Sequence, residues 1–254
     1  MEPSREDVPA LRDGLDFALE RALGPLRAST GRLGVLFSGG VDSALIAWEL
    51  RTRPGVLLCT LGREGSSDLG AGRAGAERLG LAWQALPVDP NHLKDVTSRF
   101  EKELAGASAV ARAVLVSLAL AIEQAEPDRL VCGQGADEMF LGYAHYRGLD
   151  GPEAERRSRE DLGRLRDSDW PRTQRIAEKA GKTIFAPYLS LAFEEAALRV
   201  PIDLRLPGDR PKRFFREWAV ARGLPAELAD RPKKALQYGT GVSNLLRSQD
   251  RRER

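Results

Sequence analysis

The sequence predicts an α/β fold built on a doubly wound, mostly parallel sheet. Two observations support this fold class. Apolar runs of strand length alternate with segments of helical periodicity through the first half of the chain, which is the pattern of repeated strand-helix-strand units. The run at residues 55–62 is continuously apolar, as expected for a strand that helices cover on both faces. In such a sheet, ligands bind in the crevice at the carboxyl ends of the strands.

The elements are expected in the following order. Apolar residues at helical spacing predict a helix over residues 8–26. Four apolar runs predict strands at residues 33–37, 55–62, 81–88 and 128–133. A long apolar segment, residues 110–125, predicts a helix buried against the sheet, and residues 212–221 predict a helix late in the chain. Lys212, at the start of that late helix, has two alternatives: it faces phosphate, or it is solvated as most lysines are, and the second is the expectation.

The composition is that of an ordinary globular protein. Hydrophobic residues make up 42% of the 254 residues, and 39 basic against 37 acidic residues leave a formal charge of +2. This balance gives no basic field, so nucleic acid is not expected as a partner. Because no apolar run approaches the roughly 20 residues that span a bilayer, and the polar N-terminus lacks the apolar centre of a secretion signal, we expect a cytoplasmic protein without a membrane partner. Cys59 and Cys132 lie inside apolar runs, which favours buried thiols over a disulfide or a metal site.

The most informative stretch is the hexapeptide SGGVDS, residues 38–43, which lies between the first predicted strand and a helix. Its adjacent glycines allow a tight turn and a close approach of a ligand to the backbone amides. The amides of the helix start, the helix dipole and the hydroxyls of Ser38 and Ser43 favour a phosphate group there. No lysine follows the glycines, so this is not the common GxxxxGKS/T loop. Asp42 instead indicates a divalent cation between the protein and a nucleotide.

A second glycine turn, GQGADEMF at residues 133–140, follows the fourth predicted strand. Because the carboxyl ends of parallel strands lie at one edge of a sheet, we expect this turn in the same crevice as SGGVDS. Asp137 would then face the same cation as Asp42. The alternative is that Asp137 and Glu138 only cap a helix.

The hexapeptide resembles the signature of the PP-loop ATP pyrophosphatases, which cut ATP between its α and β phosphates. A narrower resemblance then extends along the chain. GQGADEMFLGY at residues 133–143 is similar to the GEGSDELFGGY segment of asparagine synthetases, and SGGVDS lies where they have SGGLDS. APYL at residues 186–189 and RPKK at 231–234 resemble later segments of that family, in the same order. The resemblance implies a PP-loop nucleotide-binding core over residues 1–148 and a mostly helical part over 149–254 that completes a synthetase domain.

In that family, a carboxylate attacks the α-phosphate of ATP, pyrophosphate leaves, and ammonia or an amine captures the acyl-adenylate as an amide. The resemblance implies Mg2+ ligands at Asp42 and Asp137. It implies pyrophosphate contacts at Ser38, Gly39, Gly40 and Ser43. Charge develops on the leaving pyrophosphate, so fixed positive groups around it would lower the barrier.

Further roles follow from the same resemblance. Lys233 would stabilise the adenylation transition state, with Lys234 as the alternative if the alignment shifts by one residue. The backbone of Leu61 and Gly62 would recognise adenine. Gly133 would lie beside the nucleotide.

The chain departs from the family pattern at four positions. Glutamine-dependent members begin with a glutaminase domain whose cysteine directly follows the initiator methionine, where this chain has Glu2. We therefore expect nitrogen as free ammonia, as an amine, or from a separate glutaminase. Gln134 replaces a glutamate that handles the incoming nucleophile, and an amide cannot act as a base, so Gln134 is expected only to orient it. Thr183 and Ser190 replace a glutamate and an aspartate.

Together these features predict an ATP- and Mg2+-dependent amide-forming ligase, an enzyme that forms a carbon–nitrogen bond on a small-molecule carboxylate. One alternative is an ATP-binding regulatory or subunit protein without turnover, which the last three departures suggest. Another is a different PP-loop chemistry such as tRNA base modification, although the balanced charge speaks against it. The sequence leaves the acceptor carboxylate open, and it leaves open both a monomer and a homodimer.

Overall fold

The computed structural model describes residues 7–208, 210–231 and 240–250. Five strands form one parallel sheet in the order β3-β2-β1-β4-β5. The strands are β1 (Leu33–Leu36), β2 (Val56–Gly62), β3 (Ala82–Pro87), β4 (Arg129–Val131) and β5 (Thr183–Phe185). The predicted doubly wound, mostly parallel fold class is confirmed.

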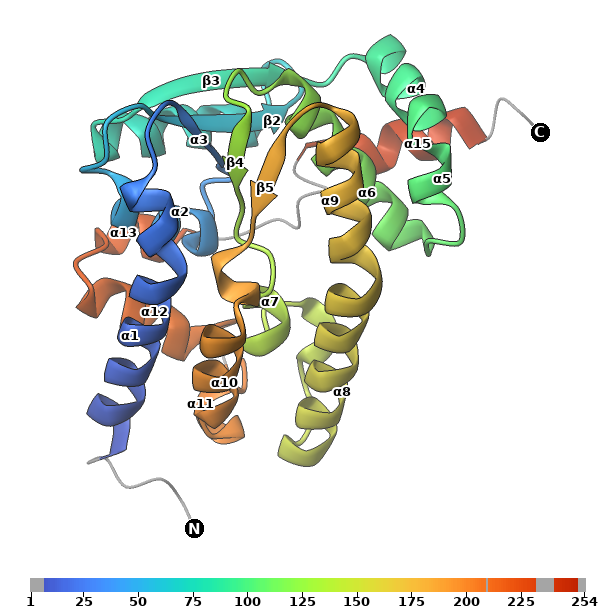
Figure 1. Ribbon diagram of the computed structural model, residues 1–254. Helices are drawn as coiled ribbons and strands as arrows, with labels where there is room; N and C mark the ends of the chain where they lie inside the picture. Colours follow the sequence, from blue (N-terminus) through green and yellow to red (C-terminus); the bar gives the residue numbers. More distant parts are fainter. Residues whose placement is uncertain (1–6, 209, 232–239, 251–254) are drawn as a thin grey trace.

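Helices and helical turns surround the sheet (Figure 1). Those before β4 are α1 (Asp7–Ala28), α2 (Val41–Leu50), α3 (Ser67–Leu79), α4 (Pro90–Arg99), α5 (Glu101–Leu104) and α6 (Ala109–Gln124). Between β4 and β5 lie α7 (Ala136–Met139), η1 (Ala144–Tyr146), α8 (Gly151–Arg164), η2 (Leu165–Asp169) and α9 (Trp170–Lys179). After β5 follow η3 (Pro187–Leu189), α10 (Leu191–Arg199), α11 (Ile202–Arg205), α12 (Arg213–Ala221), α13 (Ala226–Ala229) and α15 (Val242–Asp250).

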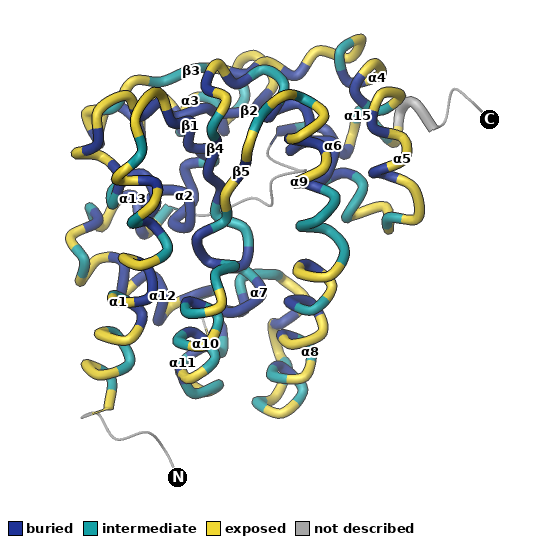
Figure 2. Tube along the Cα trace, in the orientation of Figure 1, coloured by how far each residue is buried: buried dark blue, intermediate teal, exposed yellow. Residues whose placement is uncertain are grey.

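The hydrophobic core has two large parts, one on each face of the sheet. Strand β2 shows the division, because it is buried at every position and its successive side chains point to opposite faces. Val56 and Leu58 belong to the cluster that α1, α2 and α12 complete. Leu57 and Cys59 belong to the cluster that α4, α6 and α9 complete. Figure 2 shows that the central strands β1 and β2 are mostly buried, whereas β3 and β5, at the two edges of the sheet, are partly exposed.

The strand order fixes where a ligand would bind. β2 and β3 lie on one side of β1, and β4 and β5 lie on the other, so the strand order reverses at β1. Ligands of open α/β sheets bind outside the carboxyl ends of the strands at such a reversal. The SGGVDS loop follows β1 and the second glycine turn follows β4, which puts both at this place.

Strand β5 is an addition that the sequence did not predict. It lies within residues 149–254, which were expected to be mostly helical, and it pairs with β4 in the register Arg129↔Thr183. The C-terminal part therefore completes the sheet as well as supplying helices. No helix in the described part of the chain is long and apolar enough to cross a bilayer.

Candidate active site

The SGGVDS loop forms a tight turn between β1 and α2. Gly39 has a φ of 69°, a conformation that favours glycine, and Gly40 is the N-cap of α2 without a side-chain cap. The two serines hold the turn from inside. Ser43 Oγ donates to the Gly40 carbonyl at 3.2 Å, and the Gly40 amide donates to Ser38 Oγ at 3.3 Å. The start of α2 thus presents its amides and the positive end of its dipole from a preformed turn, as in anion sites.

The second glycine turn packs directly against this loop. A Cβ on Gly133 would lie 2.9 Å from Asp42 Cβ and 3.3 Å from the Ser43 amide nitrogen, so only glycine fits there. Gly135 has a φ of 102° and begins α7, which carries Asp137. The predicted proximity of the two turns is therefore confirmed.

Two carboxylates converge on one ammonium group in the crevice. Lys212 Nζ lies 2.6 Å from Asp42 Oδ1 and 2.5 Å from Asp137 Oδ1, and its side chain is only 2% exposed. The expectation that Lys212 is solvated is wrong, because α12 begins beside the crevice and the two carboxylates compensate the buried charge. Among the described residues, no three His, Cys, Asp or Glu side chains gather as a metal-binding group.

The arrangement also tests whether this site suits Mg2+. The Lys212 ammonium lies between two carboxylate oxygens, so these oxygens already bind one positively charged group. Carboxylate oxygens are the protein ligands that Mg2+ prefers, and it commonly binds through one or two of them together with substrate phosphates. Asp42 and Asp137 therefore fit the ion that the sequence predicted for them.

Strained backbone borders this carboxylate pair. Leu141 with a φ of 54° and Lys212 with a φ of 59° are the non-glycine residues with positive φ in the described chain. Gly142 directly follows Leu141, and a Cβ on Gly142 would overlap both Asp137 Oδ1 and Lys212 Cε. Such strain concentrates at functional sites.

Glu138 is a third carboxyl group beside the crevice. Burial raises the pKa of Glu138 to about 7, and the negative charge of Asp137 adds to the effect. The hydroxyl of Tyr143 donates to Glu138 Oε1 at 2.6 Å, whereas Oε2 is buried without a hydrogen-bond partner in the described structure. The sequence offered Glu138 only as a helix cap. Its adjacency to Asp137 was the available signal.

Two residues from the C-terminal part hold the loop in place. The hydroxyl of Tyr188, in η3, donates to the Asp42 carbonyl at 2.8 Å. Arg231 Nη1 donates to the Ser38 carbonyl at 3.0 Å, and a Cβ on Gly39 would overlap this guanidinium. The predicted catalytic residues that follow Arg231, Lys233 and Lys234, lie outside the described residues.

The other predicted site residues flank the loop. Leu61 and Gly62 end β2, the strand next to β1, so they share its carboxyl edge. The Gly62 carbonyl accepts a hydrogen bond from the Val88 amide at 3.0 Å, which ties this edge to the segment after β3. Gln134 lies half-buried between the two glycines of the second turn.

Two of the positions that depart from the family pattern, Thr183 and Ser190, lie in different environments. Thr183 is exposed at the start of β5. Ser190 is the N-cap of α10, and its Oγ is buried without a hydrogen-bond partner in the part of the chain that the structure describes.

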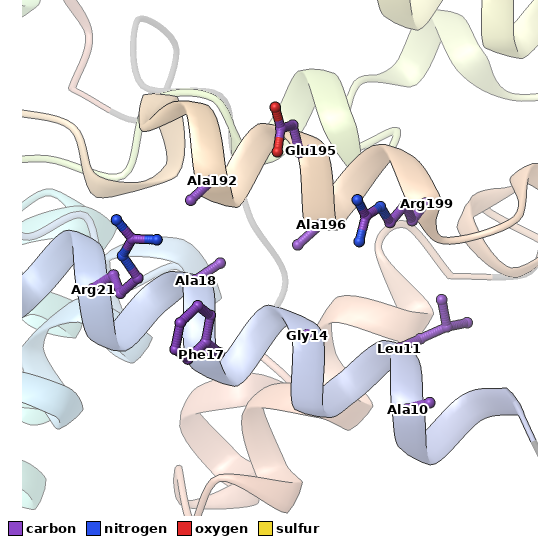
Figure 3. Close-up of a pocket in the computed structure, with 10 residues that line it drawn as sticks. All are labelled: Ala10, Leu11, Gly14, Phe17, Ala18, Arg21, Ala192, Glu195, Ala196 and Arg199. Atoms are coloured by element: carbon purple, nitrogen blue, oxygen red, sulfur yellow. The ribbon is translucent and has the colours of Figure 1, made fainter.

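A further hollow of about 260 Å³ lies away from the two glycine turns, between α1 and α10 (Figure 3). Ala192 and Ala196 of α10 point toward α1, where Phe17 is 62% exposed. No residue predicted for the site lines this hollow. The candidate active site is therefore the crevice at the carboxyl ends of the strands.

The sheet, the glycine loop after its central strand and the paired carboxylates define an α/β protein of the PP-loop ATP pyrophosphatase class. Comparison with known proteins narrows this class. The family model described as asparagine synthase matches residues 14–182 and 149–253. The chain belongs to the asparagine synthase family, a family of ATP-dependent ligases.

Individual relatives agree with the family match. A Methanocaldococcus jannaschii protein named as a glutamine-hydrolyzing asparagine synthetase is 26% identical, covering 92% of this chain and 50% of the relative. The Gallus gallus asparagine synthetase is 25% identical, covering 97% of this chain and 46% of the relative. The chain thus spans about half the length of these curated relatives. Among solved structures, the U34-tRNA thiolase NcsA of Methanococcus maripaludis is 13% identical, with a TM-score of 0.43, covering 96% of this chain and 75% of that chain.

Proposed function

We propose that the chain is an ATP- and Mg2+-dependent ligase that activates a small-molecule carboxylate as an acyl-adenylate, releases pyrophosphate and forms an amide with ammonia or an amine. The single observation that carries the proposal is the convergence of Asp42 and Asp137 beside the SGGVDS loop. Family membership supports the reaction type. The geometry supports it further, because a glycine turn whose amides suit a phosphate and a carboxylate pair that suits a cation lie in one crevice.

Each part of the crevice has a proposed task. The amides and hydroxyls of residues 38–43 would bind the β and γ phosphates, whose charge increases as they leave. Asp42 and Asp137 would hold Mg2+. The ion would neutralise charge on the phosphates. Leu61, Gly62 and Gly133 would line the nucleoside side of the same edge, and Lys233 or Lys234 would stabilise the adenylation transition state.

The proton of the amine step needs a separate acceptor. Gln134 cannot take it, because an amide is not a base at neutral pH. The proton would therefore pass to a base supplied by the substrate or by the solvent. Gln134 would then orient the nucleophile by hydrogen bonds alone.

The decisive experiment measures pyrophosphate released from Mg-ATP with a panel of carboxylates that includes aspartate. Each carboxylate is tested with ammonium, with glutamine and with neither. We expect release that depends on one carboxylate, with an amide product when a nitrogen source is present. Asp42→Asn should lose the activity while it keeps its fold, and Asp95→Asn, at an exposed position of α4, is the matched control.

A regulatory or subunit role without turnover is the second candidate. It is favoured by Gln134, Thr183 and Ser190, where the family has a base or a carboxylate. ATP binding by calorimetry, without release of pyrophosphate from ATP in the presence of any of the carboxylates, would support this candidate and contradict the ligase proposal. Release that Asp42→Asn abolishes would exclude it.

A further inference from the structure

Lys212 occupies the position that a metal ion shared by Asp42 and Asp137 would need. Its Nζ atom faces Oδ1 of each aspartate, at 2.6 and 2.5 Å. A Mg2+ ion would bind carboxylate oxygens at about 2.1 Å. An ammonium group and a divalent ion placed between the same two oxygen atoms would crowd and repel each other. The two cations therefore compete for one pair of ligands.

The lysine comes from a different part of the fold than the aspartates. Asp42 lies in the first turn of α2 and Asp137 in the first turn of α7, whereas Lys212 is the N-cap of α12. The ammonium thus joins three elements that surround the crevice. Its buried stem also passes Gly142, where any side chain would collide with it.

We propose that Lys212 is an exchangeable internal cation: it holds Asp42 and Asp137 at a separation suited to a metal ion, and it leaves both carboxylates when a divalent ion binds. This inference deepens the proposed function, because it concerns the metal site of that reaction. Lys212 is a positioning residue here, since it acts through the two aspartates. Its left-handed backbone conformation, φ 59°, is strained, and the two ion pairs offset that strain.

Competition has a measurable consequence. An ion that enters the site must displace a buried, doubly paired ammonium, so the wild-type protein should bind divalent ions weakly. Removing the ammonium removes both the competitor and its repulsion of the ion. A variant without this charge should therefore bind the ion more tightly, whereas a residue with only a structural role would leave the affinity unchanged or lower it.

The test uses the full chain without nucleotide, with Mn2+ as the probe and electron paramagnetic resonance to count free ion. Lys212→Met keeps the apolar stem and removes the charge, and we expect its Mn2+ affinity to rise about tenfold or more. Asp42→Asn should abolish the same site, which identifies it. Lys179→Met is the matched control, because Lys179 Nζ pairs with Glu103 Oε1 at 2.7 Å far from the crevice. An unchanged or weaker affinity in Lys212→Met would overturn the proposal.

A second measurement uses the wild-type protein, so it does not depend on whether a variant folds. Wild-type protein is acylated with an amine-reactive reagent, and modification of Lys212 is followed by mass spectrometry with and without Mn2+. Mn2+ should speed modification of Lys212 several-fold and leave Lys179 unchanged. Bound Mn2+ with an unchanged rate at Lys212 would refute the exchange. Neither measurement requires turnover, so both results can be interpreted even if the ligase proposal fails. If the protein releases pyrophosphate but Mn2+ does not displace Lys212, the ligase proposal stands and the inference about Lys212 is refuted.

Discussion

Gly142→Ala tests whether the geometry of the crevice, rather than the fold, carries the activity. A Cβ at this position would come well within 3.0 Å of Asp137 Oδ1 and of Lys212 Cε. Atoms that touch without strain are about 3.5 Å apart, so both groups would have to move by more than about 1 Å. Gly142 has no positive φ, so alanine can adopt its backbone conformation. The effect is therefore steric and local.

The size of the losses in stability and activity depends on which atoms the new Cβ displaces. Both overlapping atoms are side-chain ends, so the fold should survive at a cost of about 1 to 3 kcal/mol in the free energy of unfolding, the range for an overpacked site. A displacement of about 1 Å in a reacting constellation costs about 100-fold in rate, so pyrophosphate release should fall by about that factor. Urea denaturation measures the first effect, and the pyrophosphate assay measures the second.

Gly70→Ala is the matched control for this variant. Gly70 lies in α3, and a Cβ there meets no atom within 4 Å. Alanine should raise the free energy of unfolding by up to about 1 kcal/mol through its helix propensity and leave activity unchanged. Wild-type activity in Gly142→Ala, or an equal loss in both variants, would refute the reasoning.

Three further predictions concern the support of the site and the core. Tyr188→Phe removes the hydroxyl that donates to the buried Asp42 carbonyl, so urea denaturation should show a loss of about 1 to 2 kcal/mol, and no loss would contradict the assigned bond. Burial raises the pKa of both Cys59 and Cys132 from 9.0 to about 12. The native thiols should therefore resist iodoacetamide at about pH 9 while both react in urea, and modification of the native protein would count against their burial. Because the folded-state pKa values are raised, their contribution to stability is complete below pH 9.0 and is lost as the pH rises toward 12, which a series of thermal unfolding curves measures. Arg205→Met leaves two backbone carbonyls and a carboxylate without their buried donor, so it should cost about 3 kcal/mol or more, whereas a loss below about 1 kcal/mol would show that these bonds contribute little.

The parts of the fold that could be predicted are those that a pattern of neighbouring residues in the sequence determines. β2 was recognisable because its run is apolar at nearly every position. Two of its side chains belong to one core cluster and three belong to the cluster on the opposite face of the sheet. β5 has only three residues, and only Ile184 of them is buried. Its stability comes from pairing with β4, a contact between distant segments that no local pattern encodes.

The same distinction separates the predicted from the missed parts of the site. Asp42 and Asp137 each follow a strand whose position was predictable, so the parallel sheet brought them together as expected. Lys212 lies in a polar turn before α12, where a charged residue is normally solvated, and its burial depends on where α12 docks. Glu138 is similar, because Ser158 Oγ of α8 donates to its carbonyl at 2.8 Å and α8 covers its helix. Such burial is a tertiary property.

Backbone strain gives an independent reason to place function in this crevice. Leu141 and Lys212 each adopt a left-handed conformation that costs about 1 to 3 kcal/mol for a residue other than glycine. Leu141 is fully buried, and Lys212 is fixed by two carboxylates, so packing and charge hold both in place. Leu141 directly precedes Gly142 in the chain, and the Lys212 ammonium contacts the carboxylate of Asp137. The two ion pairs offset this cost at Lys212, so its side chain is best explained by the arrangement of charge that it maintains.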